Sequence, residues 1–324
     1  MKKLGRFTFP ASKSLRIAGN RRTLAKKEPP RVCRRLHFLK GWGHGEYGTT
    51  IFWETLRQDP RLLCFDEPFN RNLIDLPTEH RKRTRLEFIR LLSEDPERFW
   101  DTFAPIDPSE ELHTALSDRQ REYLRFILSR SERVVIDSTR LSFKLRALRE
   151  VAPDARVIHL YRAPEAFASS HLRPTGQGWT DAIRTRWKSR SFFTRVSDYS
   201  NWSVERIIGS STLRPFGLAL REAGIDPEAI YSAPAVARLL AYWRLHYDQM
   251  EIHGPSQFQE QFRSVSFEEF CRHPDRAMRD LYDWLEMDHV DLDFSRIKPA
   301  APPHSPHDPR WQVARSLAGI QTRS

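Results

Sequence analysis

The sequence predicts an α/β fold: a P-loop-like open parallel sheet of about five strands, with helices on both faces and a helical insertion. Short apolar runs alternate with stretches of helical periodicity, which is typical of βαβ units around a buried parallel sheet. A glycine-rich turn at residues 41–48 separates the first apolar run from the first helical stretch. The composition, with 39% hydrophobic residues, 29% charged residues and a mean hydropathy of −0.62, is that of a globular protein.

Each predicted strand is a short apolar run that ends at a turn or at the start of a helix. The five runs cover residues 32–40, 62–65, 134–136, 155–161 and 261–267. The first continues into the glycine-rich turn, and Pro68 stops the second. A helical stretch follows each of the last three, so we expect all five strands to run parallel.

The predicted helices follow from apolar spacing and from helix start signals. We expect helices over residues 49–58, 141–151, 164–172 and 275–285, and a polar helical region over residues 77–130. Leu145, Leu148 and Val151 share one face of the second helix. Pro164 lies in the first turn of the third, where a missing N–H is tolerated.

The predicted organisation is a single α/β domain over residues 32–298. Residues 1–31 are predicted to be a basic, disordered leader, with an organelle transit peptide as the alternative. Residues 173–254 are rich in aromatic and basic side chains and become helical at 233–250. We interpret them as a helical insertion over the carboxyl edge of the sheet, where open α/β sheets bind ligands. Residues 299–324 are predicted to be a Pro-rich C-terminal tail.

The net charge of the chain is +11, but the distribution of this charge argues against nucleic-acid binding. Residues 1–31 carry ten basic residues and one acid, a net of +9, and the rest of the chain carries only +2. No apolar run approaches the roughly 18 residues that span a bilayer. Cys33, Cys64 and Cys271 lie far apart without a C-x-x-C pair, which argues against disulfides and zinc and favours a cytoplasmic location.

The glycine-rich turn is the first chemical signal. A glycine turn that opens a helix after a strand offers backbone N–H groups and a helix N-terminus to phosphate oxygens. Gly48 is followed by Thr49 and Thr50 with no lysine before them, so the Walker pattern G-x-x-x-x-G-K-[ST] is absent. This argues against ordinary kinase or GTPase chemistry.

Five stretches, in order, resemble the sulfotransferase family, whose members use 3′-phosphoadenosine 5′-phosphosulfate. Residues 45–50 (GEYGTT) resemble the loop for the 5′-phosphosulfate, and residues 161–170 (YRAPEAFASS) resemble the motif for the 3′-phosphate. Residues 140–144 (RLSFK) resemble the link between strands three and four. Residues 65–70 (FDEPFN) and 266–274 (SFEEFCRHP) are similar to stretches of bacterial and carbohydrate-directed members.

The resemblance implies a donor site at the carboxyl edge of the sheet. It assigns the 3′-phosphate to Arg162 and Ser170, because a guanidinium and a hydroxyl two helical turns on can converge on one phosphate. It places Trp53 beside the adenine and assigns the 5′-phosphosulfate to Gly45, Glu46, Tyr47, Gly48, Thr49 and Thr50. The alternatives are an Arg162–Glu165 ion pair, core packing for Trp53 and helix capping by the two threonines.

Glu46 departs from the family pattern, which has lysine or arginine at this position of the loop. A carboxylate facing a sulfuryl group that gains negative charge costs on the order of a few kcal/mol at an effective ε near 20. Another cation is therefore expected to substitute. Arg140, after the third strand, is preferred and Lys40 is the second choice, with Lys144 and His44 as further candidates. A surface charge at a helix start is the alternative role for Arg140.

Sulfuryl transfer also needs a base to take the proton of the acceptor. Glu67 is the best candidate, because it follows the second strand and the rigid Glu-Pro step directs its side chain to the carboxyl edge. A structural carboxylate is the alternative, and His80 and His113 are weaker candidates. His304 and His307 resemble metal ligands, but a Pro-rich tail organises ligands poorly, and the chemistry requires no metal.

The sequence thus predicts an enzyme that moves a sulfuryl group to a hydroxyl, or less favourably an amine, of a small molecule or carbohydrate acceptor. It predicts neither a nucleic-acid partner nor a membrane span. Two alternatives stay open. One is a non-catalytic nucleotide-binding scaffold protein, which would explain Glu46 directly. The other is a different phosphate-handling P-loop-like enzyme.

Overall fold

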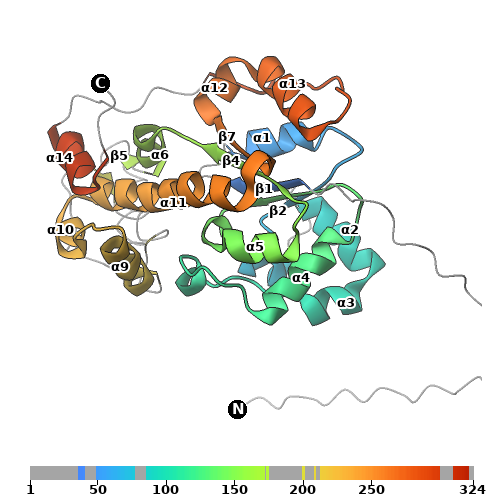
Figure 1. Ribbon diagram of the computed structural model, residues 1–324, viewed down its shortest axis with the longest axis horizontal. Coiled ribbons are helices and arrows are strands. Elements are labelled where there is room, and N and C mark those ends of the chain that lie inside the picture. Colours follow the sequence, from blue (N-terminus) through green and yellow to red (C-terminus); the bar gives the residue numbers. More distant parts are fainter. Residues whose placement is uncertain are drawn as a thin grey trace, which may run out of the picture. The chain divides into compact units, whose positions relative to one another are not determined.

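Five short strands form a parallel sheet in the order β2-β3-β1-β4-β7 (Figure 1). They are β1 (Leu36–Lys40), β2 (Leu63–Asp66), β3 (Val134–Ser138), β4 (Arg156–Tyr161) and β7 (Phe262–Ser266). The computed structural model describes residues 36–40, 49–76, 85–171, 173–174, 199–200, 208, 212–299 and 309–320; residues 36–40, 49–50, 173–174 and 199–200 are described at the level of the backbone. The predicted leader lies outside this part of the chain.

The first strand lies at the centre of the sheet, between β3 and β4. Phe38 is opposite Asp137 of β3 and Ile158 of β4. The chain moves to one side of β1 to form β2 and β3, and to the other side to form β4 and β7. Such a reversal of direction opens a crevice at the carboxyl ends of the strands, where ligands bind in open α/β sheets.

Helices cover both faces of the sheet, which confirms the predicted α/β class (Figure 1). Alternate residues of one strand face opposite sides: Val135 packs in the cluster under α1, α12 and α13, whereas Val134 and Ile136 pack in the cluster with α2, α4 and α5. On the first side the helices are α1 (Thr49–Leu56), α12 (Phe267–Arg272) and α13 (Pro274–Leu285). On the second they are α2 (Leu86–Glu94), α3 (Pro96–Thr102), α4 (Asp118–Leu128) and α5 (Leu145–Val151).

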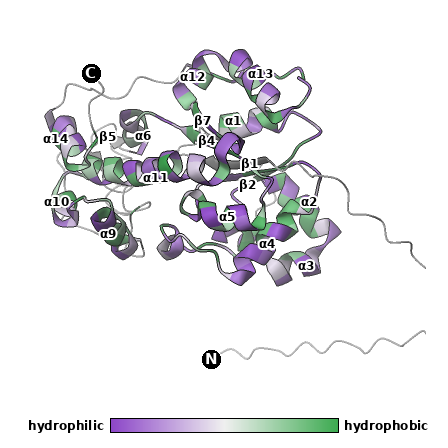
Figure 2. Ribbon diagram, in the orientation of Figure 1, coloured by the Kyte–Doolittle hydropathy of each residue, from purple (hydrophilic) through white to green (hydrophobic). Residues whose placement is uncertain are grey.

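The longest described helix, α11 (Ala235–Phe258), joins this second layer to a further helical cluster. It contacts β4, β7 and α5, and it also packs against α6 (Pro164–His171) and α14 (Pro309–Leu317). Two shorter helices, α9 (Leu213–Glu222) and α10 (Pro227–Ser232), complete the cluster. Both hydrophilic and hydrophobic residues occur along these helices, as expected of helices with one buried face (Figure 2).

The helical part of the predicted insertion is tied to the domain core. The helix expected at 233–250 extends to Phe258 and has Met250 and Phe258 in the cluster beneath the sheet. In the first part of the predicted insertion, residues 173–200, the structure describes two short paired segments, β5 (Arg173–Pro174) and β6 (Tyr199–Ser200). The predicted C-terminal tail contains α14, whose Trp311 is buried against α11.

Candidate active site

The carboxyl edge of the sheet gathers the predicted site residues from four strands. Lys40 is the last residue of β1, Glu67 follows β2, Arg140 comes two residues after β3, and Arg162 follows β4 directly. Because the strands are parallel, their ends share one edge. The shared edge follows from the order of strands and helices in the sequence.

Glu67 lies in an unusual backbone conformation at the end of β2. Its φ is 49°, which is rare for a residue with a Cβ, and its N–H donates to the Asp137 carbonyl at 2.6 Å. Its side chain is buried, with 6% of the residue exposed. Carboxylate Oε1 accepts hydrogen bonds from the Thr139 N–H at 2.9 Å and the Thr139 hydroxyl at 2.7 Å. The turn after β2 is therefore joined to the end of β3.

Arg140 donates from Nη1 to Oε2 of Glu67 at 2.8 Å, so two of the predicted catalytic residues form an ion pair. Burial opposes the charge of Arg140, but Glu67, Glu111 and Tyr242 together hold its pKa above the ordinary value. The guanidinium is thus a permanent cation at this edge. Its Nε is buried and has no hydrogen-bond partner in the described part of the chain.

Glu111 is a buried carboxyl near Arg140 that sequence analysis missed. It follows the short 3₁₀ turn Pro108–Glu110 and is 6% exposed. Burial, opposed by Arg140 and assisted by Glu67, raises the pKa of Glu111 to about 7. The hydroxyl of Tyr242, from α11, also interacts with this carboxyl. A glutamate in a polar loop is usually solvated, so nothing in the local sequence marks it.

Lys144 holds the loop that carries Glu111. Its Nζ donates to the carbonyl oxygens of Glu110 at 3.0 Å, Glu111 at 3.0 Å and His113 at 2.8 Å. Burial lowers the pKa of Lys144 to about 8, against the opposite effect of Glu111 and Glu110. The three bonds occupy all three ammonium donors. In this arrangement Lys144 supports the backbone of the loop, and it has no donor left for a ligand.

Arg162 lies at the junction of β4 and α6. Its carbonyl accepts a 2.9 Å hydrogen bond from Nε1 of Trp243, which fixes the junction against α11. The guanidinium covers the Phe267 ring at 5.2 Å, and its Nε lies 3.9 Å from Oε1 of Glu268. Burial lowers the pKa of Arg162, which Glu268 and Cys271 partly offset. Like that of Arg140, the buried Nε has no hydrogen-bond partner among the described residues.

Ser170 is exposed on the second turn of α6, beyond Arg162. Its hydroxyl donates to the Phe167 carbonyl at 2.7 Å. The alternative ion pair between Arg162 and Glu165 does not form, because Glu165 instead pairs with Arg315 of α14 at 2.8 Å. The acid near Arg162 is Glu268, whose Oε1 also accepts from the Ala163 N–H at 3.1 Å.

The remaining predicted donor residues surround the start of α1. Gly45, Glu46, Tyr47 and Gly48 lie outside the described residues. Thr49 and Thr50 are the first two residues of α1. Trp53 is 1% exposed in the core, with the Arg57 guanidinium 5.0 Å from its ring centre. Its burial favours the core-packing alternative over stacking with adenine.

A comparison with known proteins adds the family. The model of the sulfotransferase family matches residues 43–206, about half of the 324 residues, and this span contains Glu67, Arg140 and Arg162. The chain belongs to the sulfotransferase family. It is therefore a sulfotransferase enzyme whose acceptor the match leaves unspecified. No curated protein matches the sequence.

Solved sulfotransferase structures are similar to this sulfotransferase over 90% of its chain. The sulfotransferase from Alicyclobacillus acidocaldarius is 14% identical, with 98% of its own chain covered and a TM-score of 0.37. Sulfotransferase STF9 from Mycobacterium avium is 16% identical, with 69% covered and a TM-score of 0.40. The sulfotransferase domain of the Synechococcus PCC 7002 olefin synthase is 15% identical, with 89% covered and a TM-score of 0.39.

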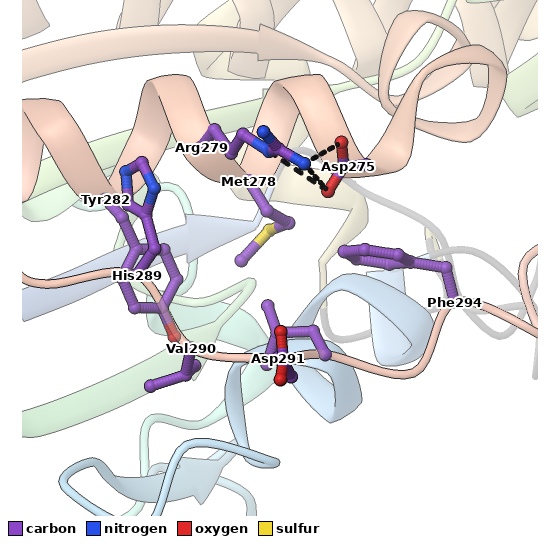
Figure 3. A pocket seen from close by; sticks show the side chains of 9 residues that line it. Asp275, Met278, Arg279, Tyr282, His289, Val290, Asp291 and Phe294 are labelled. Atoms are coloured by element: carbon purple, nitrogen blue, oxygen red, sulfur yellow. Dashed lines mark hydrogen bonds and ion pairs between the residues drawn. The ribbon is translucent and has the colours of Figure 1, made fainter.

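A surface pocket of about 410 Å³ lies apart from the predicted site residues of this sulfotransferase (Figure 3). It lies between α13 and the segment that follows it. Met278 and Phe294 contribute apolar surface, and an Asp275–Arg279 ion pair at 2.9 Å lies at its margin. None of the residues proposed for donor binding or catalysis lines it.

A further arginine near the helical cluster has protein partners, and three of the histidines considered above lie outside the described residues. Arg244, on α11, donates to the carbonyls of Ala318 and Gly319 and pairs with Asp248. His80, His304 and His307 lie outside the described residues. Within the described ranges, no group of three or more His, Cys, Asp or Glu side chains could hold a metal ion. No helix in that part of the chain is long and apolar enough to cross a membrane.

Proposed function

We propose that this sulfotransferase moves a sulfuryl group from 3′-phosphoadenosine 5′-phosphosulfate to a hydroxyl, or less favourably an amine, of a small molecule or carbohydrate. The observation that carries the proposal is a pair of cations at the carboxyl edge of the sheet. Arg140 and Arg162 are mostly buried, and each has a buried Nε without a hydrogen-bond partner among the described residues. Buried donors without partners are costly, so an anionic ligand fits them.

In the proposed site Arg162 and Ser170 bind the 3′-phosphate. To donate to the phosphate, the Ser170 hydroxyl would turn away from the Phe167 carbonyl that it now contacts. Residues 45–50 bind the 5′-phosphosulfate through backbone N–H groups and the start of α1. The position of α1 directly after this loop supports that assignment.

Arg140 is proposed as the cation that stabilises the leaving phosphate, with Lys40 as the second candidate. The donor, when bound, supplies a sulfuryl group whose bond to the phosphate oxygen breaks as the oxygen of the acceptor attacks in line. Negative charge then develops on the leaving phosphate, and a guanidinium fixed at that position stabilises it without reorganisation. The ion pair with Glu67 is what fixes the Arg140 guanidinium here.

Glu67 is proposed as the base that takes the proton of the acceptor. Oε1 accepts two hydrogen bonds from Thr139 and Oε2 accepts one from the Arg140 guanidinium, and in this proposal Oε2 takes the proton of the substrate hydroxyl. A proton arriving on Oε2 would weaken its bond to Arg140 at the moment when the leaving phosphate needs that cation. The pairing of Glu67 and Arg140 therefore couples the two halves of the proposed transfer.

The first test is nucleotide binding. Isothermal titration with 3′-phosphoadenosine 5′-phosphate should show binding by the wild type and a loss of at least tenfold in affinity for Arg162→Ala, since a charge-assisted contact contributes on the order of 1.5–3 kcal/mol. Arg272→Ala is the matched control, because Arg272 is an exposed arginine on α12 that pairs with Glu269. Failure of the wild type to bind this nucleotide would refute the proposed donor.

The second test is transfer with radiolabelled donor across a panel of hydroxyl and amine acceptors. The proposal expects label in at least one acceptor, and Glu67→Gln should lower kcat by about 10²-fold or more. Binding without transfer to any acceptor would favour the scaffold alternative.

A third test concerns Glu46. Glu46→Lys should raise donor affinity if Arg140 replaces the usual loop cation, since the lysine adds a second cation beside the phosphosulfate.

A further inference from the structure

Five side chains from distant parts of the sequence form a buried charged group behind the proposed donor site. We call it the Arg140 cluster and define it as Glu67, Glu111, Arg140, Lys144 and Tyr242. Glu67 and Arg140 come from the strand ends, Glu111 and Lys144 from the loop and turn beside them, and Tyr242 from α11. Glu111, Glu67 and Lys144 are all less than 9% exposed. The proposed function uses Arg140 and Glu67 and leaves Glu111 unexplained.

At pH 7 the charge of the cluster depends mainly on Glu111, because the Lys144 ammonium, with a pKa lowered to about 8, is still mostly protonated there. With Glu111 ionised, two carboxylates balance the Arg140 and Lys144 cations, and the sum is zero. With Glu111 protonated, the sum is +1. Burial raises the pKa of Glu111 to about 7, so both forms are populated at neutrality. His246 of α11 also faces this region, and burial holds its pKa well below the ordinary value, so it stays neutral.

The position of Glu111 relative to Arg140 connects this charge to ligand binding. Arg140 interacts electrostatically with both Glu67 and Glu111, and among the described residues its ion pair is with Glu67. An anion bound at Arg140 adds negative charge next to Glu111, which disfavours the ionised carboxyl. By linkage, the anion then binds better to the protein in which Glu111 carries a proton.

We propose that Glu111 is a positioning residue for the donor site: it accepts a proton when the anionic donor binds at Arg140, and so removes one of the two negative charges that Arg140 balances. The inference rests on the proposed function, since it takes the donor to bind at Arg140. The inference goes beyond the proposed function because donor binding then depends on pH through Glu111, a residue that does not touch the donor. Lys144 fixes the backbone of Glu111, so charge and not movement is what changes.

Proton uptake is the measurement that separates this role from a structural one. Isothermal titration of 3′-phosphoadenosine 5′-phosphate at pH 7, in buffers of different ionisation enthalpy, gives the number of protons taken up on binding. A group half protonated in the free protein takes up at most about 0.5 proton. The number of protons taken up on binding should be larger for the wild type than for Glu111→Gln, by up to about 0.5. Protonation of the nucleotide itself contributes equally to both proteins and cancels in this difference.

The affinity of the nucleotide should differ between the same two proteins. At pH 7.5 about a quarter of Glu111 is protonated, so Glu111→Gln should bind up to about fourfold more tightly than the wild type, and the two should converge near pH 6. Glu110→Gln is the matched control: Glu110 lies on the same loop and its carbonyl also accepts from Lys144, but its carboxyl contacts Gln120 and the Asp107 N–H. It should behave as the wild type.

A second variant and a ligand-free measurement guard against misfolding. Tyr242→Phe removes a hydroxyl that stabilises the ionised carboxyl, so the pH at which proton uptake is greatest should move upward. The melting temperature of Glu111→Gln minus that of the wild type should increase as pH rises from about 4.5 to 7. Over that range an acid whose pKa is raised on folding increasingly destabilises the folded wild type, and the glutamine does not titrate.

Equal proton uptake by wild type and Glu111→Gln, with both binding the nucleotide, would overturn this inference and leave the proposed function standing. Absence of nucleotide binding by every protein would overturn both. Weaker binding by Glu111→Gln than by the wild type at pH 7.5 would also contradict the inference, because it would show that the ionised carboxyl assists the donor.

Discussion

The strained backbone at Glu67 gives a stability prediction whose sign is unusual. We compare Glu67→Ala with Glu67→Gly. Both remove the same three hydrogen bonds and leave the Arg140 charge buried without its ion-pair partner, which should cost about 3–5 kcal/mol in the free energy of unfolding. The two variants differ only in how they tolerate the backbone at this position.

The φ of 49° decides which of the two is more stable. A residue with a Cβ pays about 1–2 kcal/mol in the left-handed region, whereas glycine does not. Glycine loses about 0.4–1 kcal/mol through the greater freedom of its unfolded chain. The difference leaves Glu67→Gly more stable than Glu67→Ala by up to about 1.6 kcal/mol, with a midpoint of about 0.8 kcal/mol.

Urea denaturation, followed by circular dichroism, measures the two free energies of unfolding. Arg125 is the control, because it is exposed in the last turn of α4 and is not among the residues with a positive φ. There the order should reverse, with Arg125→Ala about 1 kcal/mol more stable than Arg125→Gly. If Glu67→Ala were more stable than Glu67→Gly by the margin seen at Arg125, the reasoning from φ would be wrong.

Three further changes test the packing that supports the site. Lys144→Met should lower the free energy of unfolding by about 3 kcal/mol or more, since three carbonyl oxygens lose the hydrogen bonds of a buried ammonium group. Gly254→Ala should lower it by about 1–3 kcal/mol, because the new Cβ would overlap the Phe262 ring. Glu286→Gly should raise it by about 0.5 kcal/mol, since φ is 56° at this helix end and the ion pair that Glu286 forms with Arg156 involves an exposed carboxylate.

The same denaturation assay measures all three, and Gly224 supplies a control for the second. Gly224 has a φ of 71°, but no atom beyond its chain neighbours lies within 4 Å of the place that an alanine methyl would take, so Gly224→Ala reports backbone strain without a clash. A Gly254→Ala protein as stable as the wild type would show that the Phe262 ring moves freely. A destabilised Glu286→Gly protein would show that the Arg156 ion pair outweighs the strain.

Much of the fold was predictable because it depends on local signals. Apolar runs bounded by glycine, proline or helix starts indicated where strands lie, and intervening helices required the strands to be parallel. Parallel strands place all their carboxyl ends at one edge, so Glu67, Arg140 and Arg162 could be assigned to that edge before any contact was known. The family resemblance then indicated which phosphate each end would serve.

The site contacts could not be predicted in the same way. Glu67 and Arg140 are 73 residues apart, and only the β2–β3 register brings them to 2.8 Å. From its sequence alone Trp53 could pack in the core or contact adenine, and its 1% exposure in the cluster with Phe52 and Leu56 depends on how α1 packs against the sheet. The α11 helix was expected in an insertion, yet its residues also complete the core under the sheet.

The sequence by itself thus determined the order of strands and helices, the shared edge and the chemical types of residue along it, because periodicity and turn residues act over short distances. Tertiary structure decided which of those charges are buried and with which partners. Glu111 shows the difference: its neighbours in sequence are those of a solvated loop, and its carboxyl is buried only because Lys144 and α11 pack around it. Desolvation depends on distant elements, and therefore no local pattern records it.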